Sequence, residues 1–272
     1  MILRGMLISG FLAFWLSGFL LAGETGTADA KSAPQADLLI CEKLESWLDR
    51  LEARSAKVET LESRIVYDKI QKLLGDKQRR LGKLIYEAGP PARFAVHFDK
   101  LMFDRRQEKQ NRWYIFDGRW LVERLDDRKQ FRKYEVVPPD APPQAADPLA
   151  LGEGPFAVPV QLNKKRLLKR FVVSLVEPET EEDSDEPENS VHLHLVPKDP
   201  SREVKAIDLW YHRETLLPLR AVTDNRSQEQ HVIKLSKHKT DGKIKTKQFD
   251  TRAPSDRGQR GWLEEIKPWE DD

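Results

Sequence analysis

The sequence predicts an α+β protein that consists mainly of antiparallel β-strands, with helices in two places. Over most of the chain, apolar and polar residues alternate at period two, which is typical of strands with one buried and one exposed face. Turn signals such as Gly89-Pro90-Pro91 and Asp117-Gly118 separate these runs. Strands do not alternate with helices, so the pattern argues against a doubly wound parallel sheet.

The first 30 residues predict export from the cytoplasm. Arg4 precedes an uncharged stretch rich in Leu and Phe from Gly5 to Gly23, and Ala28-Asp29-Ala30 offers a cleavage site of small residues. Residues 1–30 are therefore interpreted as a signal peptide. The stretch is also long enough to remain as an uncleaved inner-membrane anchor. Both interpretations place the rest of the chain in the periplasm.

The first element after the signal is an amphipathic helix, predicted from Asp37 to Ser55 with Asp37 as its cap. Its single cysteine, Cys41, falls on the apolar stripe and is interpreted as a small buried residue. One cysteine also excludes an intramolecular disulfide. The apolar residues that recur every three or four positions are Leu38, Cys41, Leu44, Trp47, Leu48 and Leu51.

The strands follow this helix. Asp117-Gly118 falls between two aromatic runs, Trp113–Phe116 and Trp120–Val122, and predicts a tight hairpin. Elsewhere we expect apolar residues two positions apart to share one strand face. These are Leu84 with Tyr86; Phe94 and Val96 with Phe98; Ile207 and Leu209 with Tyr211; and Ile233 with Leu235.

Two insertions interrupt the single domain predicted for residues 31–272. Residues 138–171 are rich in proline and then in lysine and arginine, which predicts a helical insertion outside the sheet, with a helix from Val160 to Phe171. Residues 177–189 are strongly acidic and predict a solvated loop that joins two strands. A calcium loop is the alternative, but the spacing and turn glycine of an EF-hand are missing.

Composition narrows the function. Lys and Arg total 46 and Asp and Glu total 45, so the net charge is +1 and provides no field that would attract nucleic acid. The sequence contains no GxSxG, HExxH, GxGxxG or phosphate-binding glycine loop. We therefore expect no enzyme, no cofactor, no metal and no nucleic-acid partner.

One pair of histidines leaves an alternative open. His192 and His194 lie two positions apart, so both imidazoles would share one strand face and could begin a metal site of a hydrolase. The preferred interpretation is that Leu193 and Leu195 face inward while the histidines face solvent.

The order of these features resembles the LolA-type periplasmic lipoprotein carriers, from about Leu38 to Pro254. Pro91-Ala92-Arg93-Phe94 is similar to the family's Pro-x-x-Phe strand. Asp117-Gly118-Arg119-Trp120-Leu121 is similar to its Asp-Gly-x-x-Leu hairpin. Phe249 to Pro254 is similar to its late strand that ends in proline.

The resemblance implies a strongly curved antiparallel sheet that forms an incomplete barrel, covered by the N-terminal helix and by residues 138–171 as a helical lid. An apolar cavity beneath them would hold lipid or lipoprotein acyl chains without catalysis. The implied partners are these chains and proteins of the inner and outer membranes, and a monomer is expected. The alternative is an envelope sensor or interaction module that binds a protein partner with the same half-barrel.

The candidate ligand-binding residues are apolar and aromatic side chains of the central strands. Phe94 is the first choice, because it matches the family's strand motif. Sequence alone leaves open whether Trp113 with Ile115 or Tyr114 with Phe116 faces the cavity, and whether these residues are simply core. The candidates are Phe94, Val96, Phe98, Trp113, Ile115 and Trp120.

Overall fold

The computed structural model describes residues 33–103, 106–142, 158, 160–177, 186–255 and 261–269. The chain divides into two compact units, Met1–Leu39 and Ile40–Asp272, and every described strand belongs to the second. The predicted signal peptide lies outside the described residues. Among the helices that the structure describes, none has the length and apolar character needed to cross a membrane.

Helix α1 (Ala33–Ser55) begins four residues before the predicted start. Asp37 therefore lies inside the helix, and its prediction as the cap was wrong. Pro34 explains the earlier start, because proline is tolerated in the first helical turn and has the φ angle that a helix needs. The predicted periodicity is confirmed further along, where Leu48 and Leu51 are buried. The side chain of Cys41 lies outside the described residues.

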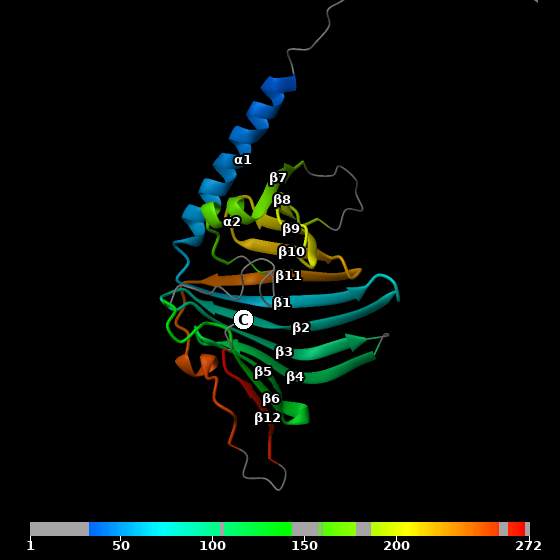
Figure 1. Cartoon of the computed structure of the whole chain (residues 1–272), viewed down its shortest axis with the longest axis vertical. Helices are drawn as coiled ribbons and strands as arrows, with labels where there is room; N and C mark the ends of the chain where they lie inside the picture. The colour runs from blue at the N-terminus through cyan, green and yellow to red at the C-terminus, as the bar shows by residue number, and fades with distance from the viewer. Residues whose placement is uncertain are drawn as a thin grey trace, which may run out of the picture. The chain divides into compact units, whose positions relative to one another are not determined.

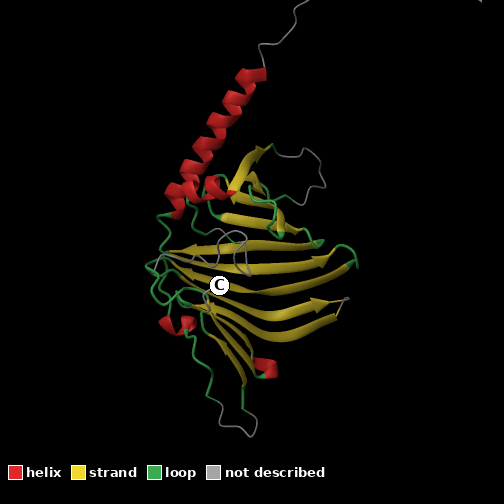
Figure 2. Ribbon diagram, in the orientation of Figure 1, coloured by secondary structure: helices red, strands yellow, loops and turns green. Residues whose placement is uncertain are grey.

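The described strands form one curved sheet that does not close into a barrel (Figures 1 and 2). Its order is β12-β6-β5-β4-β3-β2-β1-β11-β10-β9-β8-β7. The predicted fold class is confirmed, with one difference: β12 pairs with β6 in parallel, whereas the other described pairs are antiparallel. The strands are β1 (Thr60–Gln71), β2 (Asp76–Glu87), β3 (Arg93–Phe103), β4 (Arg106–Phe116), β5 (Trp120–Leu125), β6 (Gln130–Glu135), β7 (Phe171–Val176), β8 (Ser190–Pro197), β9 (Val204–His212), β10 (Pro218–Asn225), β11 (Glu229–Thr240) and β12 (Leu263–Lys267).

The mid-chain helix is shorter than the sequence predicts. Helix α2 (Lys164–Arg170) begins after Asn163, whose side chain caps it by accepting a hydrogen bond from the backbone N–H of Arg166 at 2.8 Å. It ends before Phe171, which starts β7 instead of continuing the helix. The β-branched residues that follow favour a strand. The acidic segment lies between β7 and β8 in the chain, and its residues 178–185 lie outside the described residues.

The predicted Asp117-Gly118 hairpin connects β4 and β5. The side chain of Asp117 accepts hydrogen bonds from the backbone N–H groups of Arg119 (3.0 Å) and Trp120 (2.8 Å), which holds the turn. Gly118 has φ +109°, and a Cβ there would lie 2.3 Å from side-chain atoms of Pro91. Glycine is therefore required both by the backbone angle and by the close approach of the proline turn.

A bulge bends β3 in the middle of the sheet. Gly82 of β2 pairs with Phe98, but the preceding residue of β2 pairs with Lys100, so one residue of β3 is left without a partner. A Cβ at Gly82 would lie 1.9 Å from the carbonyl oxygen of His97. The bulge can approach β2 this closely only because position 82 has no side chain.

We predict that Gly82→Ala destabilises the protein by about 1–3 kcal/mol, because the new methyl group must push against backbone atoms. Gly242→Ala is the matched control, since a Cβ at Gly242 meets no atom within 4 Å. Urea unfolding of both variants measures the effect. Equal stability of the two variants would contradict this account of the bulge.

Candidate functional site

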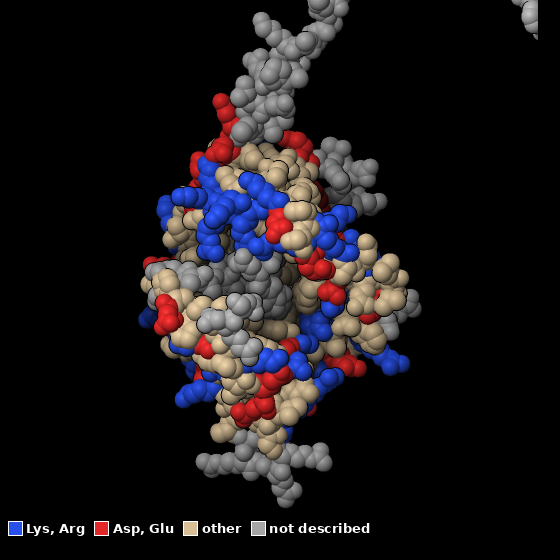
Figure 3. Space-filling model, in the orientation of Figure 1, with Lys and Arg blue, Asp and Glu red and all other residues tan. Residues whose placement is uncertain are grey.

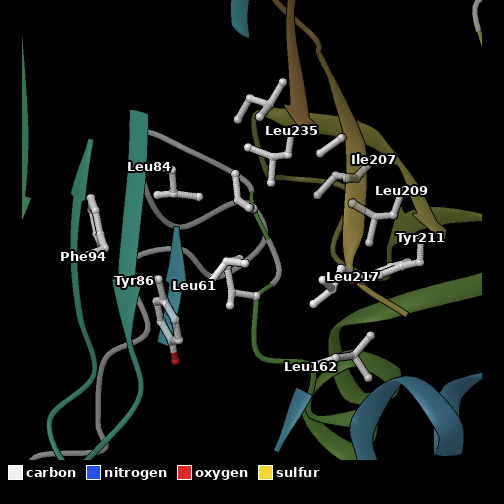
Figure 4. Packing of buried hydrophobic residues seen from close by; sticks show 14 of the residues in the cluster. Leu61, Leu84, Tyr86, Phe94, Leu162, Ile207, Leu209, Tyr211, Leu217 and Leu235 are labelled. Carbon is white, nitrogen blue, oxygen red and sulfur yellow. The ribbon is translucent and has the colours of Figure 1, made fainter. Parts of the chain in front are cut away.

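One face of the sheet is lined by apolar side chains over most of its width. On β1 to β4 it carries the alternate residues that share the face of Leu84 and Phe94. On β8 to β11 it carries those that share the face of Leu209. Figure 4 shows these two groups pointing toward one another, so this is the concave face. Its buried strand residues are Leu61, Ile65, Tyr67, Leu84, Tyr86, Phe94, Val96, Phe98, Phe116, Val191, Leu193, Leu195, Ile207, Leu209, Tyr211, Ala221, Ile233 and Leu235.

A second group of residues packs onto the concave face, and we call it the cover. It joins side chains of α1 to side chains that precede and belong to α2, and all of them form one buried cluster with the sheet. The cover consists of Leu48, Leu51, Val137, Val158, Val160, Leu162 and Leu167.

A few polar contacts tie the two helical parts of the cover together. The hydroxyl of Ser55 accepts a hydrogen bond from the backbone N–H of Leu162 at 3.1 Å. The ammonium of Lys164 pairs with Asp49 at 2.6 Å and also with Glu45. Three other basic residues of α2, Lys165, Arg166 and Lys169, are exposed, and Figure 3 shows Lys and Arg side chains gathered on this face of the molecule.

Three of the six candidate residues lie together on the concave face. Phe94, Val96 and Phe98 alternate along β3, and each is at most 1% exposed. The ring of Phe94 stacks on Phe116 of β4 with centroids 5.9 Å apart. The structure thus places the strand motif of the resemblance on the apolar inner wall.

The other three candidates, Trp113, Ile115 and Trp120, lie on the convex face. Ile115 pairs with Val122 and packs with it in a separate cluster, and Trp120 shares the face of Val122 two positions away. Trp113 and Ile115 line a different pocket of about 680 Å³, together with residues from 247 to 255. The aromatic pair on the concave side is Tyr114 with Phe116, the alternative that the sequence left open.

Strand alternation was sufficient to divide these aromatic residues into two pairs, but it could not say which pair turned inward. Pairing decides it, because Phe94 lies opposite Phe116 and Ala95 lies opposite Ile115. Most residues of the opposite wall were not among the candidates predicted from the sequence. The sequence did carry a signal for this wall, since Leu209 and Tyr211 alternate at period two like the residues of the first wall.

A belt of polar aromatic residues borders the apolar wall. Tyr67 and Tyr114 flank the ring of Phe98, with centroids 6.0 and 6.4 Å away. Burial raises the pKa of Tyr67 to about 12 and also raises the pKa of Tyr114. Both phenols therefore stay neutral, with Tyr67 bonded to His231 (2.9 Å) and Tyr114 donating to Glu123 (3.1 Å).

The three motifs that carried the resemblance meet at one end of the sheet. Pro91 lies against Gly118 of the hairpin. The hydroxyl of Thr251 donates a hydrogen bond to Asp117 at 2.6 Å. The guanidinium of Arg93 lies 4.9 Å from the ring centre of Phe249. Segments far apart in sequence are thus fastened together beside β3 and β4.

The two histidines lie on the convex face, and the leucines beside them point inward as predicted. The side chain of His194 is 37% exposed, but that of His192 is only 12% exposed, so the prediction that both face solvent was wrong for His192. His192 Nε2 and His194 Nδ1 lie 2.9 and 2.7 Å from the same oxygen of Asp208. The imidazole of His192 also stacks on Trp210 at 4.1 Å. Over the described part of the chain, no group of three or more His, Cys, Asp or Glu side chains could hold a metal ion.

Asp208 gives this histidine pair a measurable effect on stability. Burial would raise the pKa of Asp208, but hydrogen bonds from His192 and His194 outweigh it and hold the pKa below its usual 3.8. Since the folded-state pKa is the lower one, the carboxylate stabilises the protein above about pH 4 and this contribution is lost as the pH falls through the folded-state pKa.

We predict that Asp208→Asn lowers the free energy of unfolding by about 1–3 kcal/mol at pH 7. The difference from the wild type should shrink as the pH falls from about 5 toward 2, because protonation removes the same charge in the wild type. Urea unfolding at a series of pH values measures it. A difference that stays constant over this range would refute the role of the Asp208 charge.

Comparisons with solved structures reveal similarity at low identity. An uncharacterized conserved protein from Thermus thermophilus shares 12% identity at a TM-score of 0.47, over 84% of this chain and 99% of that one. A LolA superfamily protein from Nitrosomonas europaea shares 12% identity at a TM-score of 0.33, over 76% of this chain and 96% of that one. A chain of the Pseudomonas aeruginosa MucA/MucB complex shares 17% identity at a TM-score of 0.39, over 76% of this chain and 60% of that one. No protein-family model and no curated protein matches the chain. The TM-scores of these three matches are all below 0.5.

Proposed function

We propose that the protein is a non-catalytic binding protein that holds the acyl chains of lipids or lipoproteins against its concave face. The observation that carries this proposal is the apolar character of both walls of that face, from β1 to β4 and from β8 to β11. Hydrocarbon chains need no hydrogen-bond partners, and each buried CH₂ group contributes about 0.8 kcal/mol. Such a surface can therefore substitute for a membrane interior.

Binding requires the cover to move away from part of the concave face, because Phe94, Val96 and Phe98 are almost fully buried beneath their neighbours. An acyl chain would take the place of cover side chains such as Leu162 and Leu167. One apolar contact is then exchanged for another, so the net cost of opening is small compared with exposing the face to water.

The predicted signal peptide supports a periplasmic location for this binding. In that compartment the donors and acceptors of acyl chains would be proteins of the inner and outer membranes, and the binding unit would be a monomer. The alternative is that the same face binds a segment of a partner protein. Native mass spectrometry of the chain after mild extraction separates these functions, because a co-purified lipid adduct supports the proposal and a co-purified polypeptide supports the alternative.

We predict that Val96→Thr weakens the binding of a fluorescent fatty acid by about tenfold, because it places a hydroxyl on the concave face without changing the side-chain volume. Fluorescence titration measures this affinity.

Val122→Thr is the matched control. Both valines are 0% exposed, but Val122 packs on the convex face. The two variants should lose similar stability, and only Val96→Thr should lose affinity. Equal affinities for the two variants would rule out acyl binding at this position of the concave face.

A further inference from the structure

Beyond the belt of Tyr67 and Tyr114, the concave face carries polar and charged side chains as well as apolar ones. A pocket of about 360 Å³ lies there, near the far ends of β2 to β5. Its volume is within the range of about 300–1,000 Å³ that is typical of small-molecule sites. Apolar side chains, Leu101, Phe103 and Leu125, form part of its wall. Among the described residues its charged lining is unbalanced, with three arginines (Arg80, Arg112 and Arg128) and one carboxylate (Asp127).

Two of these four charged groups, Arg112 and Asp127, have polar partners outside the pocket lining or on the backbone. Arg112 forms an ion pair with Glu123, which also lies 3.5 Å from Arg132. Asp127 accepts a hydrogen bond from the backbone N–H of Asn111 at 2.7 Å. Glu123 is therefore shared between two arginines, so it does not supply a full negative charge for each of them.

Arg128 is exposed, whereas Arg80 is half-buried, with its guanidinium 6.0 Å from the ring centre of Tyr67. Arg80 donates one hydrogen bond, from Nη2 to the amide oxygen of Gln78 at 3.1 Å, and its Nε is buried without an acceptor among the described residues. It forms no ion pair with any carboxylate of the described chain. Burial lowers the pKa of the Arg80 guanidinium, and the like charge of Arg112 lowers it further. An incoming anion would relieve both effects.

We propose that this pocket binds a phosphate-type oxyanion, the headgroup of an anionic amphiphile, with Arg80 and Arg112 as its cationic ligands. Guanidinium groups bind phosphate oxygens through paired, charge-assisted hydrogen bonds. Two such groups in one pocket favour a doubly charged phosphate monoester over a carboxylate, which carries one charge. Leu101, Phe103 and Leu125 provide apolar surface for the first part of the attached chain.

That the anion belongs to a lipid rests on the proposed function, since only the belt of Tyr67 and Tyr114 lies between the pocket and the acyl-binding wall. The anion site itself does not. A free phosphate ion has the same chemistry as the headgroup, so the experiment has to distinguish the two sources.

The test is isothermal titration calorimetry on the full chain with three probes: inorganic phosphate, dodecyl phosphate and the uncharged monododecanoyl glycerol, the amphiphiles being kept below their micelle concentrations. We expect Arg80→Gln to weaken dodecyl phosphate binding at least tenfold and to leave monododecanoyl glycerol binding unchanged. Because Arg80 has no ion pair to lose, this variant should fold normally, which circular dichroism checks.

Arg64→Gln is the matched control, since it makes the same charge change at an exposed residue of β1 that faces the convex side. It should bind all three probes as the wild type does. If Arg80→Gln binds dodecyl phosphate as tightly as the wild type, the anion site is refuted. The same conclusion follows if Arg64→Gln weakens binding equally, because the effect is then one of net charge.

The probes also identify the source of the anion. Binding of dodecyl phosphate at least tenfold tighter than inorganic phosphate assigns a lipid headgroup, and similar affinities assign a free anion. The two proposals can fail separately. If Val96→Thr weakens the binding of monododecanoyl glycerol and Arg80→Gln weakens the binding of no probe, acyl binding is supported and the anion site is refuted. If Arg80→Gln weakens the binding of inorganic phosphate and Val96→Thr weakens the binding of no probe, the anion site is supported and acyl binding is refuted.

Discussion

The apolar concave face of the sheet must be shielded from water, and most other features of the protein follow from this requirement. Strand alternation puts apolar residues on both of its walls, and curvature turns those walls toward each other (Figure 4). Buried leucines and valines of α1 and of the segment before α2 complete the shielding. The helices are therefore needed because they cover the apolar face of the sheet.

Curvature in turn depends on positions where the backbone comes unusually close. Gly82 lets the bulge of β3 lie against β2, and Gly118 lets the hairpin lie against Pro91. The bond from Thr251 to Asp117 fastens a late segment to that hairpin. These contacts lie on or beside β3, the strand that carries Phe94, Val96 and Phe98. The shape of the inner wall thus depends in part on residues that contribute no apolar side chain to it.

Local pattern was enough to predict the strands that contain Leu84, Phe94 and Leu209, the hairpin, and the residues that share each face of these strands. It could not predict β12, because a strand that joins the edge in parallel depends on a long-range pairing with β6. It could not place Trp113, Ile115 and Trp120 either, since alternation does not say which face turns inward. The arginine pocket could not be predicted either, because Arg80 and Arg112 are far apart in sequence. Only the register from β2 through β3 to β4 brings them into one pocket.

Photocrosslinking with a fatty acid that carries a diazirine on its acyl chain tests the central claim most directly. After irradiation and proteolysis, mass spectrometry identifies the labelled residues. Acyl binding on the concave face predicts labels on Tyr86, Phe94 and Tyr211, together with residues of the cover such as Leu162. Labels confined to Trp113 and Ile115, or to other residues of the convex face, would contradict the account.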